Sequence, residues 1–224
     1  MKKPALYGHL QQLNQTALDI EFLLISVIQG VALATLVSAS SSPLISLQIQ
    51  TWPYVLAAFL FILIFWSGAI IHAVSFIDWP INLYHSFLYF LASLIEIIAI
   101  TNLARPLLWF IFLFLFQIIA LLLYSYDLYL IKQHKKNFLL TPSGKALYNH
   151  IVSEQQKELK VFIPASLIFN AVAVCLIFFY KSIFILKGYH LIFIFLQLLF
   201  AVAFLSQEIK SFKRRSQLLS QHIV

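Results

Sequence analysis

The chain has 224 residues, of which 62% are hydrophobic and only 10% are charged, and its mean hydropathy is +0.91. Soluble domains contain about 25% charged residues, so this composition excludes an ordinary soluble protein and indicates a polytopic membrane protein. The formal net charge of +7 does not indicate a nucleic-acid partner. The basic residues lie at predicted helix ends and in loops, where orientation in the membrane explains them.

Hydropathy along the chain predicts an all-α protein that forms one six-helix transmembrane domain over residues 1–224. The predicted spans cover, in chain order, about residues 18–38, 54–76, 81–101, 107–131, 161–180 and 190–207. The polar segment 132–160 separates the fourth span from the fifth, and Ser143 is a suitable cap for a helix within it. We expect this segment to be a cytoplasmic helix.

The distribution of basic residues predicts the orientation of the chain in the membrane. Twelve of the 15 Lys and Arg residues precede the first predicted span, lie in segment 132–160 or follow the last span. The other three are Arg105, Lys181 and Lys187, which fall in the loops of the opposite side. Under the positive-inside rule both termini are cytoplasmic, and we expect an integral protein of a bacterial cytoplasmic (inner) membrane.

The first predicted span carries polar residues at depths where a polar group facing lipid costs several kcal/mol. At about 100° per residue, the polar positions of this helix form a stripe that becomes apolar towards its far end. A stripe of this kind is expected to face water or protein, with the remaining helices around it. The candidate pathway residues on this helix are Asp19, Ser26, Gln29, Gly30, Leu33 and Val37.

The third predicted span contains Glu96, which is the most distinctive single residue of the sequence. A carboxyl group within a span costs about 2.5–3.5 kcal/mol on insertion scales and is a functional-site candidate by default. It continues a polar stripe formed by His85, Ser86, Tyr89 and Ser93. Two interpretations remain open. Glu96 is either a functional proton or ion site, or a protonated side chain that hydrogen-bonds to a neighbouring helix.

His72, His85 and Asp127 are expected at one membrane level, near the cytoplasmic ends of their helices. They are candidates for a cation vestibule or a proton-sensing cluster. The alternative is that they are ordinary polar residues at headgroup level. The mid-span amides Gln29, Gln117, Asn170 and Gln197 are explained sufficiently by hydrogen bonds between helices.

The sequence contains no enzyme signature, and we expect no catalytic residues, no metal and no cofactor. The motifs H-E-x-x-H and G-x-S-x-G are missing, and five Gly residues in the whole chain leave no Gly-rich phosphate loop. The single cysteine, Cys175, builds neither a disulfide nor a thiolate metal site within one chain. The basic tail is a candidate binding site for anionic lipid through Lys210, Lys213, Arg214 and Arg215.

The segments Ile28–Ala32 and Thr35–Val37 resemble the first helix of the endolysosomal-type potassium channels and their bacterial six-helix homologues. That family opens this helix with Phe-Ser-Asp-Gly-Val, and Gln29 stands at the position of its Asp. Trp66 and His72 also follow the family's order in the second helix. The resemblance implies a homo-oligomer, a pore lined by the first helix, potassium as the ion, and Leu33 and Val37 as an apolar constriction.

These observations lead to three functional hypotheses. The first is a homo-oligomeric channel for a monovalent cation, with the first helix lining the pathway and Leu33 and Val37 as its gate. The second is a proton-coupled transporter of a small solute that uses Glu96 as its proton site. The third is a membrane module without transport activity that docks a partner through residues 132–160 and the basic tail. The expected partners are the lipid bilayer, further copies of the chain and a monovalent cation, with no nucleic acid.

Overall fold

The fold is known from a computed structural model that describes residues 4–45, 48–75, 83–138 and 142–223. Every regular element in these residues is helical, so the all-α prediction is confirmed for the described part of the chain. The helices are α1 (Pro4–Ile45), α2 (Trp52–Ser75), α3 (Leu83–Ile100), α4 (Pro106–Gln133), α5 (Lys135–Phe138), α6 (Pro142–Lys157), α7 (Ile163–Phe179) and α8 (His190–Ile223).

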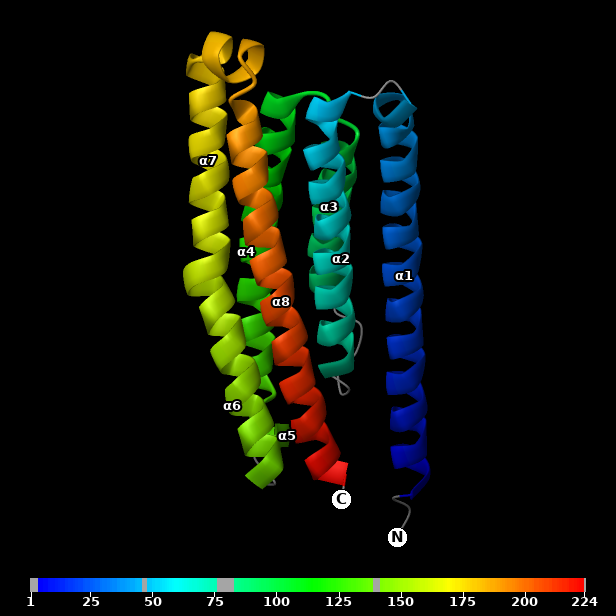
Figure 1. The fold of residues 1–224 in the computed structure, drawn as a ribbon. Coiled ribbons are helices and arrows are strands. Elements are labelled where there is room, and N and C mark those ends of the chain that lie inside the picture. The colour runs from blue at the N-terminus through cyan, green and yellow to red at the C-terminus, as the bar shows by residue number, and fades with distance from the viewer. Residues whose placement is uncertain (1–3, 46–47, 76–82, 139–141, 224) are drawn as a thin grey trace.

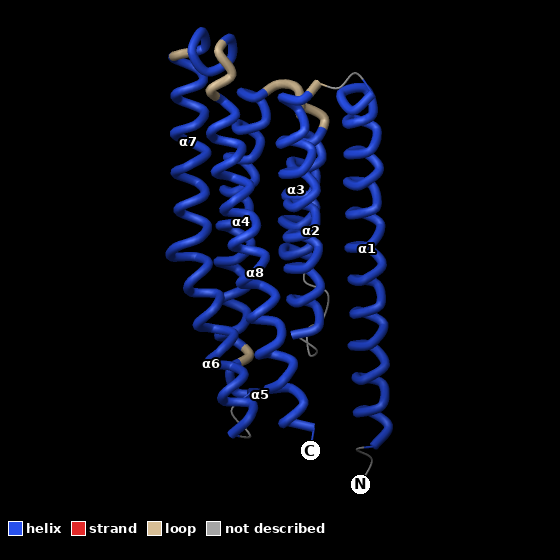
Figure 2. Tube along the Cα trace, viewed as in Figure 1, coloured by secondary structure: helices blue, strands red, loops and turns tan. Residues whose placement is uncertain are grey.

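The long helices run side by side and form an elongated bundle (Figure 1; Figure 2). The start of α1 and the end of α8 lie at the same end of this bundle, which we call the terminal end (Figure 1). The α3–α4 and α7–α8 connections lie at the opposite end, which we call the loop end. Helix α1 packs against α2 and α3 at the edge of the bundle, whereas α4 contacts α3 and α7, and α8 contacts α2 and α6.

Five helical stretches in the described residues are long and apolar enough to cross a membrane. They are Leu18–Ser41, Ile49–Ile71, Pro106–Gln133, Gly144–Phe179 and His190–Leu218. The helix Tyr84–Ile100 is apolar but shorter, and the start of the predicted span 81–101 falls partly outside the described residues. A hydrocarbon core about 30 Å thick takes about 20 helical residues, so the bundle has the dimensions of an integral membrane protein.

From Pro142 onward, the predicted cytoplasmic segment forms one continuous helix with the fifth predicted span rather than a separate element. Helix α6 passes into α7 through a π-helical turn, Glu158–Phe162. Pro164 follows in the first turn of α7. Proline has no backbone N–H and its ring crowds the carbonyl group four residues earlier, so a widened turn is the expected local response. Helix α8 likewise continues through the basic tail to Ile223.

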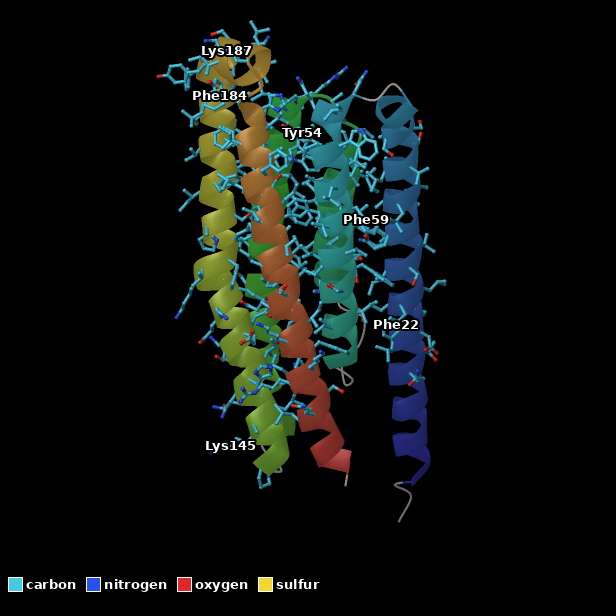
Figure 3. All side chains as sticks on the ribbon, in the orientation of Figure 1. Phe22, Tyr54, Phe59, Lys145, Phe184 and Lys187 are labelled. Carbon is cyan, nitrogen blue, oxygen red and sulfur yellow. The ribbon has the colours of Figure 1, made fainter. Side chains whose placement is uncertain are left out.

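The main hydrophobic cluster of the described residues includes Tyr54, Trp109 and Phe110, which are almost fully buried. Tyr54 lies towards the loop end of the bundle (Figure 3). The rings of Tyr54 and Trp109 meet edge-to-face with 5.7 Å between their centroids. The Tyr54 hydroxyl lies 2.9 Å from His190 Nδ1, which joins α2 to α8. Aromatic pairs of this geometry contribute about 0.5–1.5 kcal/mol beyond the area that they bury.

A chain of hydrogen bonds connects three helices beside this aromatic core. The Trp109 indole N–H on α4 donates to Gln197 Oε1 on α8 over 3.0 Å. Gln197 Nε2 donates to Asn170 Oδ1 on α7 over 3.1 Å, and Asn170 Nδ2 donates to the Ser166 carbonyl oxygen over 2.9 Å. The polar side chains of this group are therefore paired with one another. This pairing agrees with the interpretation that Asn170 and Gln197 form hydrogen bonds between helices.

We expect Gln197→Leu to destabilise the bundle by about 1–3 kcal/mol, because it leaves the buried Trp109 N–H without an acceptor and Asn170 Oδ1 without its donor. The measurement is the free energy of unfolding of the purified protein in bicelles. Ser206→Ala on the exposed face of the same helix is the matched control and should change stability by less than about 0.5 kcal/mol. Equal stability of the two variants would contradict the structural role of Gln197.

Candidate functional site

A cavity of about 140 Å³ lies inside the bundle and is lined by residues of every long helix. Most of its wall is apolar, but it also contains four carboxyl groups, one imidazole and one guanidinium. These side chains are Glu21, His85, Asp127, Glu158, Glu208 and Arg215. A concave, largely apolar site with a few converging polar groups is the usual form of a small-ligand site, so this cavity is the candidate functional site.

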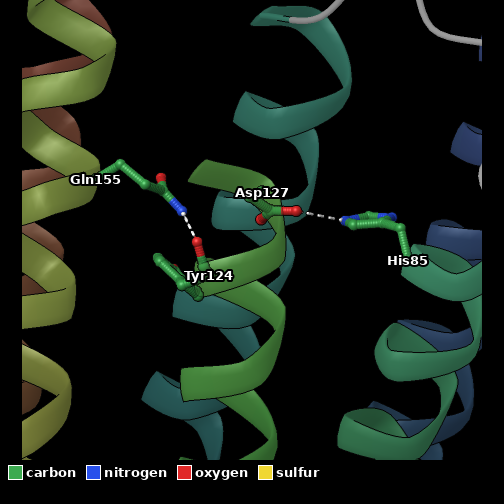
Figure 4. Close-up of polar contacts among 4 residues, drawn as sticks. All are labelled: His85, Tyr124, Asp127 and Gln155. Carbon is green, nitrogen blue, oxygen red and sulfur yellow. Dashed lines mark hydrogen bonds and ion pairs between the residues drawn. The ribbon is translucent and has the colours of Figure 1, made fainter. Parts of the chain in front are cut away.

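The first polar group of the cavity joins α3 to α4. His85 Nε2 lies 3.3 Å from Asp127 Oδ1, and the Asp127 side chain is almost completely buried (Figure 4). Beside them, Gln155 Nε2 on α6 donates to the Tyr124 carbonyl oxygen on α4 over 3.1 Å. Helices α3, α4 and α6 are thereby held together around one side of the cavity.

The second polar group joins the π-helical turn to α8. Glu158 and Glu208 are 3% and 5% exposed, and their side chains hydrogen-bond to each other. Such a bond requires one carboxyl to be protonated and to donate to the other, because two ionised carboxylates in contact repel strongly. Arg215 is also buried and attracts both carboxyl groups electrostatically. The pair is therefore able to hold a shared proton, or to exchange it for another cation.

The structure separates the candidate residues of α1. Asp19, Ser26, Gly30, Leu33 and Val37 are exposed on the outer face of the bundle, and Val37 is 69% exposed. The expectation that the remaining helices enclose this stripe is wrong for a single chain, because α1 packs an adjacent face, about 100° away, through Ile25, Ala32 and Leu36.

Gln29 differs from the rest of the α1 candidates because it is only 3% exposed. Its amide lies close enough to Tyr89 and Glu96 on α3 to interact with both. No hydrogen bond of good geometry satisfies the side-chain atoms of Gln29, the Tyr89 hydroxyl or the Glu96 carboxyl. Glu96 is therefore buried between α1 and α3, and it does not line the cavity.

The polar stripe of α3 is divided between two environments. His85, Ser86 and Tyr89 line the cavity, whereas Ser93 and Glu96 do not. Ser93 Oγ donates back to the Tyr89 carbonyl oxygen over 2.9 Å, a local bond within the helix. His72 lies outside the side chains that the structure describes, so its predicted place beside His85 and Asp127 stays a prediction.

Arg215 corrects the prediction for the basic tail. Lys210, Lys213 and Arg214 are exposed on α8, as a lipid-binding surface requires, but Arg215 is only 6% exposed and lines the cavity. Its burial has a direct physical reason. The neighbouring Glu158 and Glu208 need a compensating positive charge, since an uncompensated buried charge is strongly unfavourable.

Sequence reasoning missed Glu158 and Glu208 as site residues. Glu158 falls in segment 132–160, just before the fifth predicted span, and Glu208 directly follows the last predicted span, so the hydropathy pattern predicts both carboxyl groups in water. A signal was present: Phe162 follows Glu158 by four residues and Phe204 precedes Glu208 by four, a spacing that puts side chains on one helix face. Among the described side chains, no group of three or more His, Cys, Asp or Glu residues is placed to hold a metal ion.

Comparison with protein-family models finds no match, and neither a curated protein nor a solved structure is significantly similar to the chain.

We expect Arg215→Met to lower the free energy of unfolding by about 3 kcal/mol, because it leaves the buried Glu158–Glu208 pair without its positive neighbour. Replacing Glu158 by Gln in the same chain should recover part of this loss. Arg214→Met is the matched control, since Arg214 is adjacent but exposed. Unfolding of the purified protein in bicelles gives the measurement, and an Arg214 effect as large as that of Arg215 would contradict the assignment.

Proposed function

We propose that the protein is an integral membrane transport protein that moves a cation through the cavity inside a single chain. The observation that carries this proposal is the lining of that cavity, in which four carboxyl groups meet only one guanidinium group. Ionisable residues inside a membrane domain are costly, and in known membrane proteins they mark ion pathways and proton relays. The five apolar helices around the cavity support the membrane setting.

The two polar groups take different roles in this proposal. The Glu158–Glu208 pair binds the cation, since arrival of a cation displaces the shared proton and leaves both carboxylates neutralised. The His85–Asp127 pair lies on another wall of the cavity and accepts or returns a proton. This pathway uses α3, α4, the π-helical turn and α8 of one chain, and it does not include Glu96.

We expect Glu158→Gln and Glu208→Gln each to reduce cation flux by at least about tenfold, equivalent to about 1.4 kcal/mol. The measurement is flux into proteoliposomes of the purified protein, with K⁺, Na⁺ and H⁺ gradients tested separately. Glu154→Gln is the matched control, because Glu154 lies one turn before Glu158 on the same continuous helix but does not line the cavity.

Two results would contradict the interior pathway. The first is undiminished flux in the Glu158→Gln, Glu208→Gln double variant. The second is a loss of flux in Leu33→Ala or Val37→Ala, at the outer face of α1, while the cavity variants remain active.

The second result would favour a different candidate function, a homo-oligomeric channel in which α1 lines a pore between chains. The exposed face of α1 supports this candidate, since Asp19, Ser26 and Gly30 continue into Leu33 and Val37 along one side of the helix. The resemblance to the potassium channel family favours the same arrangement. In that case the pore needs neighbouring copies of α1 to enclose it.

The same proposal places the terminal end of the bundle in the cytoplasm. Lys145 lies near the terminal end, which also carries most of the basic residues, and Lys187 lies at the loop end (Figure 3). The positive-inside rule assigns the more basic end to the cytoplasm of a bacterial inner membrane.

Labelling with a membrane-impermeant maleimide tests this orientation in a Cys175→Ser chain. We expect Lys187→Cys to react when the outer face of the membrane is exposed to the reagent. Lys145→Cys should react only after the membrane is permeabilised. Both lysines are exposed in the bundle, so accessibility of the site itself is matched. The opposite labelling pattern would reverse the orientation.

A further inference from the structure

Aromatic rings form much of the cavity wall, and their arrangement bears on what the cavity binds. On α2, α3 and α4, the ring of Phe65 stacks on Tyr89 with 4.9 Å between centroids and meets Phe116 edge-to-face at 5.4 Å. All three residues line the cavity. A ring face carries partial negative charge, and a cation within about 6 Å of the ring centroid is attracted to it.

A second aromatic group lies beside the carboxyl pair. Phe162 ends the π-helical turn, and its ring meets that of Phe204 on α8 at 5.4 Å. Phe162 comes four residues after Glu158, and Phe204 comes four residues before Glu208. Residues at this spacing share a helix face, so each carboxyl group of the pair has a ring next to it on the same wall. The cavity therefore offers a ligand both negative charge and aromatic surface.

A cation–ring contact involves Phe162 outside the cavity. Lys157 Nζ lies 5.6 Å from the centroid of the Phe162 ring and donates to Gln207 Oε1 over 3.1 Å. Lys157 is exposed and does not line the cavity, so this contact belongs to the protein surface and leaves the cavity itself without an ammonium group from Lys157.

The Tyr89 hydroxyl is a further polar atom on a residue of the cavity wall. Tyr89 lines the cavity and is 8% exposed, and its hydroxyl oxygen has no hydrogen-bond partner of good geometry. The Gln29 amide lies within interaction distance of this hydroxyl, so the hydroxyl does not by itself require a ligand.

The size of the cavity limits the ligand. Its volume of about 140 Å³ is close to that of an engineered cavity of about 150 Å³ that admits benzene. A bare alkali ion needs a shell of oxygen atoms to replace its water; the carboxyl groups supply part of such a shell, but the largely apolar remainder of the wall does not complete it. Methyl groups around a quaternary nitrogen need no such shell, because they pack directly against ring faces.

We propose that the cavity takes a small organic ammonium ion, with its charged nitrogen at the Glu158–Glu208 pair and its alkyl groups against the rings of Phe162 and Phe204. This inference rests on the proposed cation transport function and names the class of its substrate.

The experiment is equilibrium binding of radiolabelled choline to the full-length purified protein in lipid nanodiscs. Choline has a neutral counterpart of the same shape, 3,3-dimethylbutan-1-ol, in which carbon replaces the quaternary nitrogen. We expect tetramethylammonium to displace choline, and we expect the neutral alcohol and K⁺ to compete at least about tenfold less well. Equal competition by the alcohol would show that charge is not recognised, and equal competition by K⁺ would show an inorganic-ion site. Either result overturns the proposal.

Variants separate the contributions of charge and ring. Glu208→Gln should weaken choline binding about tenfold or more, and Phe204→Leu should weaken it several-fold while keeping an apolar side chain. Phe59→Leu is the matched control for the ring, because Phe59 is 42% exposed and does not line the cavity (Figure 3). An effect of Phe59→Leu equal to that of Phe204→Leu would overturn the assignment of the rings.

A third variant fills the cavity without removing charge. A Cβ atom at Gly68 would meet the Tyr124 hydroxyl oxygen at 3.8 Å, an ordinary contact, so Gly68→Ala should fold and bind choline normally. Gly68→Leu extends further into the cavity and should abolish binding. Retained choline binding in a folded Gly68→Leu protein would overturn the assignment of the ligand to this cavity.

The flux experiment and the binding experiment test different proposals, so a negative result in one is distinguishable from a negative result in the other. If cation flux depends on Glu158 and Glu208 but choline does not bind, the transport proposal stands and the organic-ammonium proposal is wrong. If flux does not depend on these residues, the transport proposal fails whatever the binding result.

Discussion

A polar group in the hydrocarbon core of a membrane must find its partner inside the protein, and this constraint explains the organisation of the bundle. The backbone meets it by forming helices over most of the described residues, because a helix satisfies its own N–H and C=O groups. The side chains meet it in two ways. Near the aromatic core, Trp109, Gln197 and Asn170 form a hydrogen-bonded chain between three helices. Around the cavity, carboxyl groups gather in excess of the basic groups that would neutralise them.

These two regions differ in the role that their polar groups suggest: the hydrogen-bonded chain stabilises the fold, and the carboxyl groups of the cavity are candidates for function. A neutral network of amides and an indole is stable over the whole physiological range of pH and needs nothing from outside. The Glu158–Glu208 pair with Arg215 requires a proton or another cation to be neutral. A protein gains little stability from burying such charges, because their removal from water costs as much as their attraction returns. Their position inside the bundle is therefore the reason for proposing a ligand at this cavity.

The sequence predicted where the helices lie along the chain better than which side of each helix packs against the rest of the bundle. Long apolar runs separated by Pro, Asp and basic residues were sufficient to place the main helices and to expect His85 and Asp127 at one level, and the two side chains lie 3.3 Å apart. The helical wheel of α1 correctly indicated a polar stripe but not its direction. In a membrane the lipid-facing and protein-facing sides of a helix are both apolar, so the pattern did not reveal that Gln29 packs inward while Asp19 faces outward.

The carboxyl pair was missed for a different reason. Hydropathy measures the average character of a segment, and Glu158 and Glu208 lie in stretches whose average is polar. Whether such a stretch leaves the bundle or continues along it depends on contacts between distant helices. Here α6 packs against α8, and Glu158 and Glu208 are both buried where the continuation of α6 meets α8.

The π-helical turn has a geometric consequence for the position of Glu158. Along the helix that contains it, the fully buried positions advance by three or four residues, from Ile151 to Gln155 to Glu158, and then by five, to Ile163. In an unbroken α-helix a five-residue step would turn Glu158 about 140° away from Ile163, towards the outside of the bundle. The extra residue in the π-helical turn compensates for this rotation, so the buried faces of α6 and α7 stay on the same side of the continuous helix. One residue of altered helical register in the backbone thus allows this carboxyl group to point inward, where it meets Glu208 and Arg215.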